Sequence, residues 1–103
     1  MTILENKFEE EVKDKMIRAK KECKYNPTRF NQMLARYGGV ETARILISRA
    51  RQTGNMSDGF TTLYMCGRLD LTMEDSVCKP EYHALFMPEE VTYCMRILGR
   101  TSD

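Results

Sequence analysis

Residues 2–23 read TILENKFEEEVKDKMIRAKKEC, and apolar side chains recur in them at steps of three or four positions. This spacing lays one apolar stripe along about six helical turns, made by Leu4, Phe8, Val12, Met16, Ala19 and Cys23. Thr2 and Glu5 form a capping-box pattern, in which each side chain accepts a hydrogen bond from a backbone N–H at the helix start. We therefore expect a long N-terminal helix.

The opposite face of this segment carries charges in an order that suits an exposed helix. Acid precedes base by four positions in the pairs Glu9–Lys13, Glu11–Lys15 and Asp14–Arg18. Such pairs are typical of a solvent face. The segment is predicted to turn one face to the core and the other to water.

Shorter helices are predicted to follow. Asn26 and Pro27 are expected to cap and begin the second, and Gly38-Gly39 to end it. A third is expected over residues 40–51, followed by a loop over 52–59. Further starts are predicted at Thr72, Pro80 and Pro88, the last for a helix over 88–98.

The predicted fold class is all-α, with six or seven short helices packed around the long N-terminal one. No stretch alternates strictly between apolar and polar residues, so no sheet is expected. The 103 residues suit a single hydrophobic core. We assign residues 1–99 to one helical domain, which can fold alone or as a homo-oligomer, and residues 100–103 to a flexible tail.

The composition argues against several protein classes. Residues are 42% hydrophobic and 30% charged, as in ordinary globular domains. No apolar run approaches the roughly 18 residues that span a bilayer, so we expect no signal peptide, no membrane partner and a cytoplasmic location. Cys23, Cys66, Cys78 and Cys94 show no C-x-x-C spacing, which favours buried free thiols and predicts no metal or other cofactor.

Charge is divided unevenly along the chain. Up to Thr53 there are 12 Lys and Arg against 7 Asp and Glu, whereas after it there are 4 against 8. The net charge of +1 therefore combines a basic first half with an acidic second half. Such asymmetry can mark a nucleic-acid or acidic-protein partner, although folding can also interleave the two halves.

Three blocks carry a resemblance: NPTRFNQMLARYGGVETA at residues 26–43, GFTTLYMCGRLDLTMEDSV at 59–77 and PEYHALFMPEE at 80–90. Together they resemble a helical module of unknown function that recurs in uncharacterised bacterial and phage proteins. The resemblance implies a helical shape and a bacterial or phage-infected cell, and no activity. The N-terminal helix lies outside the shared blocks, and Met87-Pro88 stands where a Thr cap is more usual.

Two groups of charged residues are candidate sites. Arg68, Asp70 and Glu74 are predicted to form a structural ion network around a turn, with contact between Arg68 and phosphate as the alternative. The candidate binding surface consists of Lys20, Lys21, Lys24, Arg29, Arg44, Arg49 and Arg51. Backbone phosphates would suit this surface, but Glu22 and Glu41 interrupt it, so it can also be a solvated face.

These features favour a non-catalytic interaction module over an enzyme, because His83 and Cys78 lack the neighbours that catalysis requires. The preferred hypothesis is a protein partner. This includes an anti-CRISPR-like phage inhibitor of a nucleic-acid-handling enzyme, with acidic groups as phosphate mimics (Glu5, Glu9, Glu10, Asp70, Glu74 and Asp75). The alternative is a domain that binds nucleic acid directly through the basic surface.

Overall fold

The computed structural model describes residues 2–100, which form an all-α fold and confirm the predicted class. Residues 101–103 of the predicted tail lie outside the described part. The helices are α1 (Ile3–Cys23), α2 (Thr28–Tyr37), α3 (Gly39–Thr53), α4 (Asp58–Met65), η1 (Leu69–Leu71), α5 (Met73–Val77), η2 (Pro80–Leu85) and α6 (Pro88–Ile97), where η denotes a 3₁₀ helix. Within residues 2–100, none of these helices is both long and apolar enough to cross a membrane.

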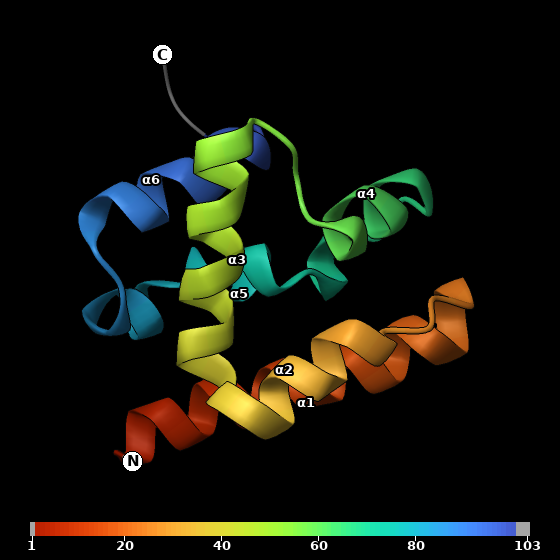
Figure 1. The fold of residues 1–103 in the computed structure, drawn as a ribbon, viewed down its shortest axis with the longest axis horizontal. Coiled ribbons are helices and arrows are strands. Elements are labelled where there is room, and N and C mark those ends of the chain that lie inside the picture. The colour runs from red at the N-terminus through yellow and green to blue at the C-terminus, as the bar shows by residue number, and fades with distance from the viewer. Residues whose placement is uncertain (1, 101–103) are drawn as a thin grey trace.

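The long α1 organises the other helices. It runs along one edge of the molecule, α2 passes in front of it in this view, and α3 rises away from both (Figure 1). α1 contacts α3, α5, η1 and η2, and α6 packs on α3 and α5. α4 lies across from α3, at the end of the loop that leaves the top of α3 in this view (Figure 1).

The predicted apolar stripe of α1 forms the centre of the core. Phe8, Val12, Met16 and Ala19 are buried, and Leu4 and Cys23 at the two ends of the stripe are half-buried. The Phe8 ring meets the rings of Tyr82 and Phe86 edge-on, with centroids 5.2 Å apart in both pairs. Edge-to-face packing adds a favourable quadrupole interaction to the burial of these rings.

The solvent face of α1 was predicted correctly only in part. Glu9 and Lys13 form an ion pair at 3.1 Å. The predicted Glu11–Lys15 pair also forms, at 3.9 Å, but the expected exposure of Lys15 is wrong, because this residue is buried and its ammonium lies closer to Asp75 of α5. Lys15 lies three positions after Val12 and four before Ala19, so the helix turns it toward the neighbouring elements.

The Gly38-Gly39 junction fits α3 closely onto α1. A Cβ on Gly39 would lie 2.8 Å from the Glu9 Cα, so only glycine fits there. The Gly39 N–H donates to Glu9 Oε1 at 2.7 Å, which places a carboxylate at the N-terminus of α3. This backbone hydrogen bond lowers the pKa of Glu9. The two glycines therefore do more than end α2.

Several predicted caps are confirmed and several boundaries shift. The Thr2 and Glu5 capping box and the Thr72 cap are present. Asn26 does not cap α2, whose N-cap is Pro27 without a side-chain hydrogen bond. The predicted loop over 52–59 is shorter than expected, because α3 continues to Thr53 and α4 begins at Asp58. Gly54 ends α3 with a left-handed φ of 77°.

The four cysteines divide into two kinds. Cys78 and Cys94 are buried free thiols, as predicted. Cys23 and Cys66 form a disulfide, with their Cα atoms 6.1 Å apart, so the prediction of free thiols is wrong for this pair. The bridge joins the end of α1 to the end of α4 across 43 positions of sequence.

Candidate binding pocket

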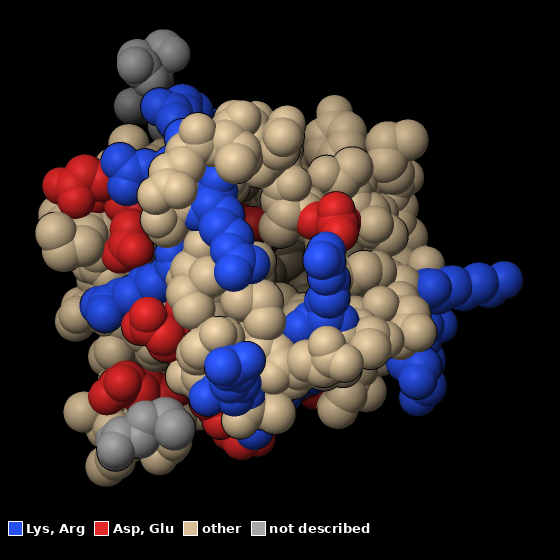
Figure 2. Space-filling view, in the orientation of Figure 1, with Lys and Arg blue, Asp and Glu red and all other residues tan. Residues whose placement is uncertain are grey.

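A pocket of about 450 Å³ opens between α2, α3, α4 and α5. Residues 55–57, in the loop between α3 and α4, also line it. Figure 2 shows this face hollowed between Lys and Arg side chains, with an acidic side chain at the edge of the hollow. The volume lies within the roughly 300 to 1,000 Å³ of ordinary small-molecule sites.

Glu74 contributes a buried carboxylate to the pocket wall. The residue is only 5% exposed, and it lies in the short helix α5, which the Thr72 hydroxyl caps. Ser57 donates a hydrogen bond to Glu74 Oε2 at 3.3 Å. No Lys or Arg among the described residues forms an ion pair with Glu74. Burial therefore dominates, and it raises the pKa of this carboxyl group.

The rest of the lining is mixed, with the polar residues Gln32, Asn55, Asp58 and Thr72 among apolar and aromatic ones. The apolar and aromatic residues include Met16, Tyr25, Phe30, Met33, Leu46, Met56, Phe60 and Met73. Methionine side chains are flexible and polarizable, so they adapt to the shape of a flat or irregular ligand. Aromatic rings add surfaces on which a planar group can stack.

Three arginines from two helices complete the lining. Arg29 and Arg36 come from α2 and Arg49 from α3, and all three are exposed. Arg29 has one weak partner, Asp58, at 3.8 Å, in a pair whose side chains are both almost fully solvated. In the described part of the chain, neither Arg36 nor Arg49 forms an ion pair, and the Arg36 guanidinium lies over the Tyr37 ring at 5.4 Å. Guanidinium groups of this kind are available to an anion.

The pocket includes only part of the basic surface predicted from sequence. Arg29 and Arg49 line it, whereas five of the predicted residues do not: Lys20, Lys21, Lys24, Arg44 and Arg51. Arg44 instead donates a hydrogen bond to the Leu85 carbonyl at 2.6 Å. Arg36 was missed, although it follows Arg29 by seven positions, or about two helical turns, which puts both on one face of α2.

The predicted network of Arg68, Asp70 and Glu74 forms with one different member. The Arg68 guanidinium donates to both carboxylate oxygens of Asp70, at 3.0 and 3.1 Å, and also to Glu22 of α1. Including Glu74 was wrong, because α5 turns its side chain into the pocket. The remaining pairs fasten the turn before η1 to the end of α1, in agreement with a structural role.

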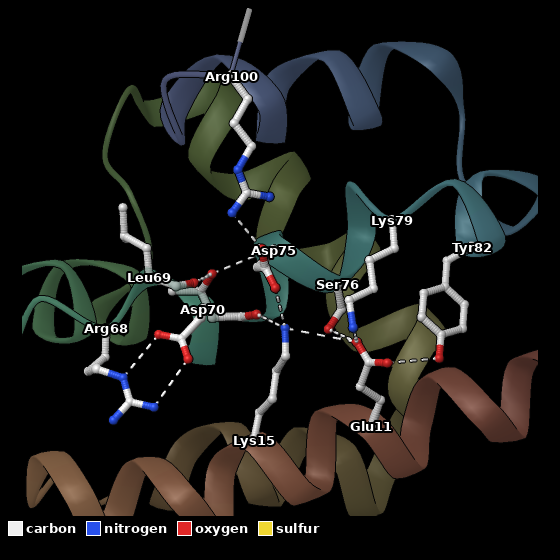
Figure 3. A network of polar contacts seen from close by, with 11 residues as sticks. Glu11, Lys15, Arg68, Leu69, Asp70, Asp75, Ser76, Lys79, Tyr82 and Arg100 are labelled. Carbon is white, nitrogen blue, oxygen red and sulfur yellow. Dashed lines mark hydrogen bonds and ion pairs between the residues drawn. The ribbon is translucent and has the colours of Figure 1, made fainter.

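A second polar cluster, which we call the Lys15 network, was not predicted (Figure 3). Lys15 Nζ lies 2.8 Å from Asp75 Oδ2 and donates to the Thr72 carbonyl at 3.0 Å. Arg100 reaches the other Asp75 oxygen at 2.6 Å. Burial raises the pKa of Asp75, but the hydrogen bonds from Lys15 and Arg100 outweigh it, so the pKa is lowered overall.

Glu11 extends the Lys15 network toward η2. Its carboxylate accepts hydrogen bonds from Ser76 at 2.6 Å and Tyr82 at 3.1 Å, and pairs with Lys79 at 3.0 Å (Figure 3). Each carboxylate of this network thus has several donors. The network holds α1 against α5 and η2, and it leaves little capacity for a ligand.

Most of the acidic groups that were considered as phosphate mimics have partners within the fold. The Glu5 carboxylate accepts from the Thr2 N–H and so caps α1, Glu9 caps α3, and Asp75 pairs with Lys15. An acidic surface built from these groups would have to break those contacts first. Among the described residues, Arg36 and Arg49 of the pocket lining are exposed and form no ion pair.

No family profile, no curated protein and no solved structure matches this chain. The resemblance to a bacterial and phage module remains a prediction from the sequence blocks alone.

Proposed function

We propose that this chain is a non-catalytic interaction module that binds single-stranded nucleic acid at the pocket. The observation that carries the proposal is the set of three exposed arginines that line one pocket, two of them without an acidic partner in the described chain. Arginine binds phosphate oxygens through paired N–H donors, so the rim suits a phosphate backbone.

A single strand fits this site better than a duplex. The pocket is lined by aromatic and methionine side chains, which offer stacking surfaces to an unpaired base while the arginines meet adjacent phosphates. The bases of a duplex are stacked and cannot enter a pocket without being flipped out.

The nucleophile candidates support a binding role over a catalytic one. Burial raises the pKa of Cys78 to about 11, and it also raises the pKa of Cys94, so both thiols stay protonated at neutral pH. The single histidine, His83, contacts the Cys78 carbonyl through Nε2 at 2.9 Å and lies outside the pocket.

Fluorescence anisotropy with a short labelled RNA of mixed sequence tests the proposal. The double variant Arg36→Gln with Arg49→Gln should weaken binding by about ten-fold or more, and it should flatten the dependence of log K on log salt by about 1.4, since each phosphate contact on a single strand contributes about 0.7. The matched control is Lys20→Gln with Lys21→Gln, which removes the same charge outside the pocket and should have a much smaller effect.

Equal losses in the two double variants, or no binding by the wild type, would contradict the proposal. In the second case, retention of one protein from a nuclease-treated bacterial lysate would favour the protein-partner hypothesis. The narrower prediction of an anti-CRISPR-like inhibitor would then be tested on that protein.

A further inference from the structure

We propose that the pocket selects guanine, whose Watson–Crick edge donates two hydrogen bonds to Glu74. This inference rests on the proposed function and adds a base specificity to it. The elements that recognise the ligand are the Glu74 carboxylate inside the pocket, the aromatic and methionine walls, and the arginines at its rim.

The Glu74 carboxylate has fewer hydrogen-bond donors around it than it can accept from. A carboxylate has about four lone-pair positions. The Ser57 hydroxyl meets one of them at 3.3 Å and the backbone N–H of Glu74 itself meets another, so about two remain for a ligand. Glu74 is only 5% exposed to solvent, and it lines the pocket. A ligand that offers N–H donors there restores the hydrogen bonds that burial took from this group.

Among the common bases, guanine matches a carboxylate best. Its N1–H and 2-amino groups are adjacent donors that point in the same direction, so they can meet both oxygens of one carboxylate. Adenine and cytosine each present a ring nitrogen acceptor beside their amino group, and uracil presents two carbonyl acceptors beside its N3–H. Those acceptors would face, and repel, the oxygens of Glu74 in its ionised form, which is the form that guanine's two donors stabilise.

The pocket also has the dimensions and surfaces that a nucleotide requires. Its volume of about 450 Å³ exceeds that of a planar base and leaves room for part of the sugar. Phe30 and Phe60 are buried behind the lining, whereas the half-buried Tyr25 and the exposed Tyr37 also line the pocket and can contact the faces of a base. Arg29, Arg36 and Arg49 are then close enough to the entrance to contact the flanking phosphates.

The test compares labelled uridine oligomers that carry one central guanosine, inosine or adenosine. The wild type should bind the guanosine strand about ten-fold more tightly than the adenosine strand, with inosine between them because it keeps N1–H and lacks the 2-amino group. Glu74→Gln keeps the shape of the side chain and removes its charge, so it should abolish this order while leaving salt-dependent binding of all strands. Glu89→Gln, an exposed change on α6 outside the pocket, is the matched control and should preserve the order.

The outcomes separate the two proposals. Absence of binding to every strand would overturn the proposed function together with this inference. Binding without a preference for guanosine, or a preference that survives Glu74→Gln, would overturn the inference alone. A circular dichroism spectrum and melting curve for each variant show that it is folded, so a lost preference reports on recognition.

Discussion

Glu74 and Asp75 are neighbours in α5, and both side chains are largely withdrawn from solvent, yet their surroundings differ in almost every respect. Asp75 meets the Lys15 ammonium at 2.8 Å and the Arg100 guanidinium at 2.6 Å. Among the described side chains only Ser57 donates a hydrogen bond to Glu74, whose carboxylate also meets its own backbone N–H, and the residue lines the pocket. The pKa of Asp75 is lowered, whereas burial raises the pKa of Glu74.

This difference indicates two roles: Asp75 stabilises the fold through its ion pairs, whereas Glu74 is free to accept hydrogen bonds from a ligand. The donors around Asp75 offset its loss of hydration, so its charge stabilises the packing of α1 on α5. Glu74 loses hydration with little compensation, which costs stability in the free protein. Such a cost is common at binding sites, where the ligand supplies the missing contacts.

The largest effect is expected when the paired carboxylate is removed. Asp75→Asn leaves the buried Lys15 ammonium without its closest counter-charge, and breaking a buried pair in this way costs about 3–5 kcal/mol. Burial already lowers the pKa of Lys15 despite its acidic partner, so the lysine is poorly hydrated. Urea denaturation at neutral pH measures the loss in free energy of unfolding.

The pH dependence of this loss provides a check. The folded state lowers the pKa of Asp75 below its ordinary value of 3.8, so its contribution is complete above that value and disappears as pH falls through the folded pKa. The wild type and Asp75→Asn should therefore converge in acid. A constant difference across the acid range, or a loss under 1 kcal/mol at neutral pH, would contradict the assignment of Asp75 as a stabilising pair.

Local patterns in the sequence predicted the helical framework well. The apolar stripe of α1, the Thr2 and Thr72 caps and the proline at the start of α6 depend on residues only a few positions apart, and all are present. Lys15 could have been placed from the same pattern, since it shares the face of Val12 and Ala19. Its pair with Glu11 was predicted correctly, but its burial was missed because pairs at this spacing are usual on exposed helix faces.

The pocket and the disulfide could not be derived in this way. Glu74 lines the pocket because α5 packs on α1 and α3, where the Ser57 hydroxyl of the loop before α4 meets it. Arg36 and Arg49 line the same pocket because α2 and α3 pack against each other at an angle (Figure 1). Cys23 and Cys66 are 43 positions apart. These features depend on how helices cross in space, which short-range spacing does not encode.

A smaller effect of opposite sign is expected at Glu74. Glu74→Gln removes a poorly compensated buried charge, so the free protein should gain about 1–3 kcal/mol at neutral pH. Because the folded state raises this pKa above its ordinary value of 4.5, the wild type loses stability as pH rises through the window between that value and the folded pKa. The advantage of the variant should thus be absent in acid and appear as pH rises.

Thermal melts of the wild type and Glu74→Gln across that pH range measure this gain. Glu89→Gln is the control, because its side chain is exposed and lies outside the pocket. If Glu74→Gln is less stable than the wild type at neutral pH, the Glu74 carboxylate stabilises the fold. Glu74 and Asp75 would then make contributions of the same sign.

The smallest effect is expected for the exposed carboxylate that the sequence did place correctly. Asp70 receives two hydrogen bonds from Arg68, at 3.0 and 3.1 Å, and this pairing lowers the pKa of Asp70. Its side chain is nevertheless 58% exposed, so water already solvates much of its charge. Arg68 also keeps its bond to Glu22 when Asp70 is changed.

We expect Asp70→Asn to lower the free energy of unfolding by about 0.2–1 kcal/mol in urea denaturation, and by less at high salt, where exposed pairs are screened. A loss that matches Asp75→Asn and resists salt would show that bidentate geometry, rather than burial, sets the contribution of a carboxylate in this fold.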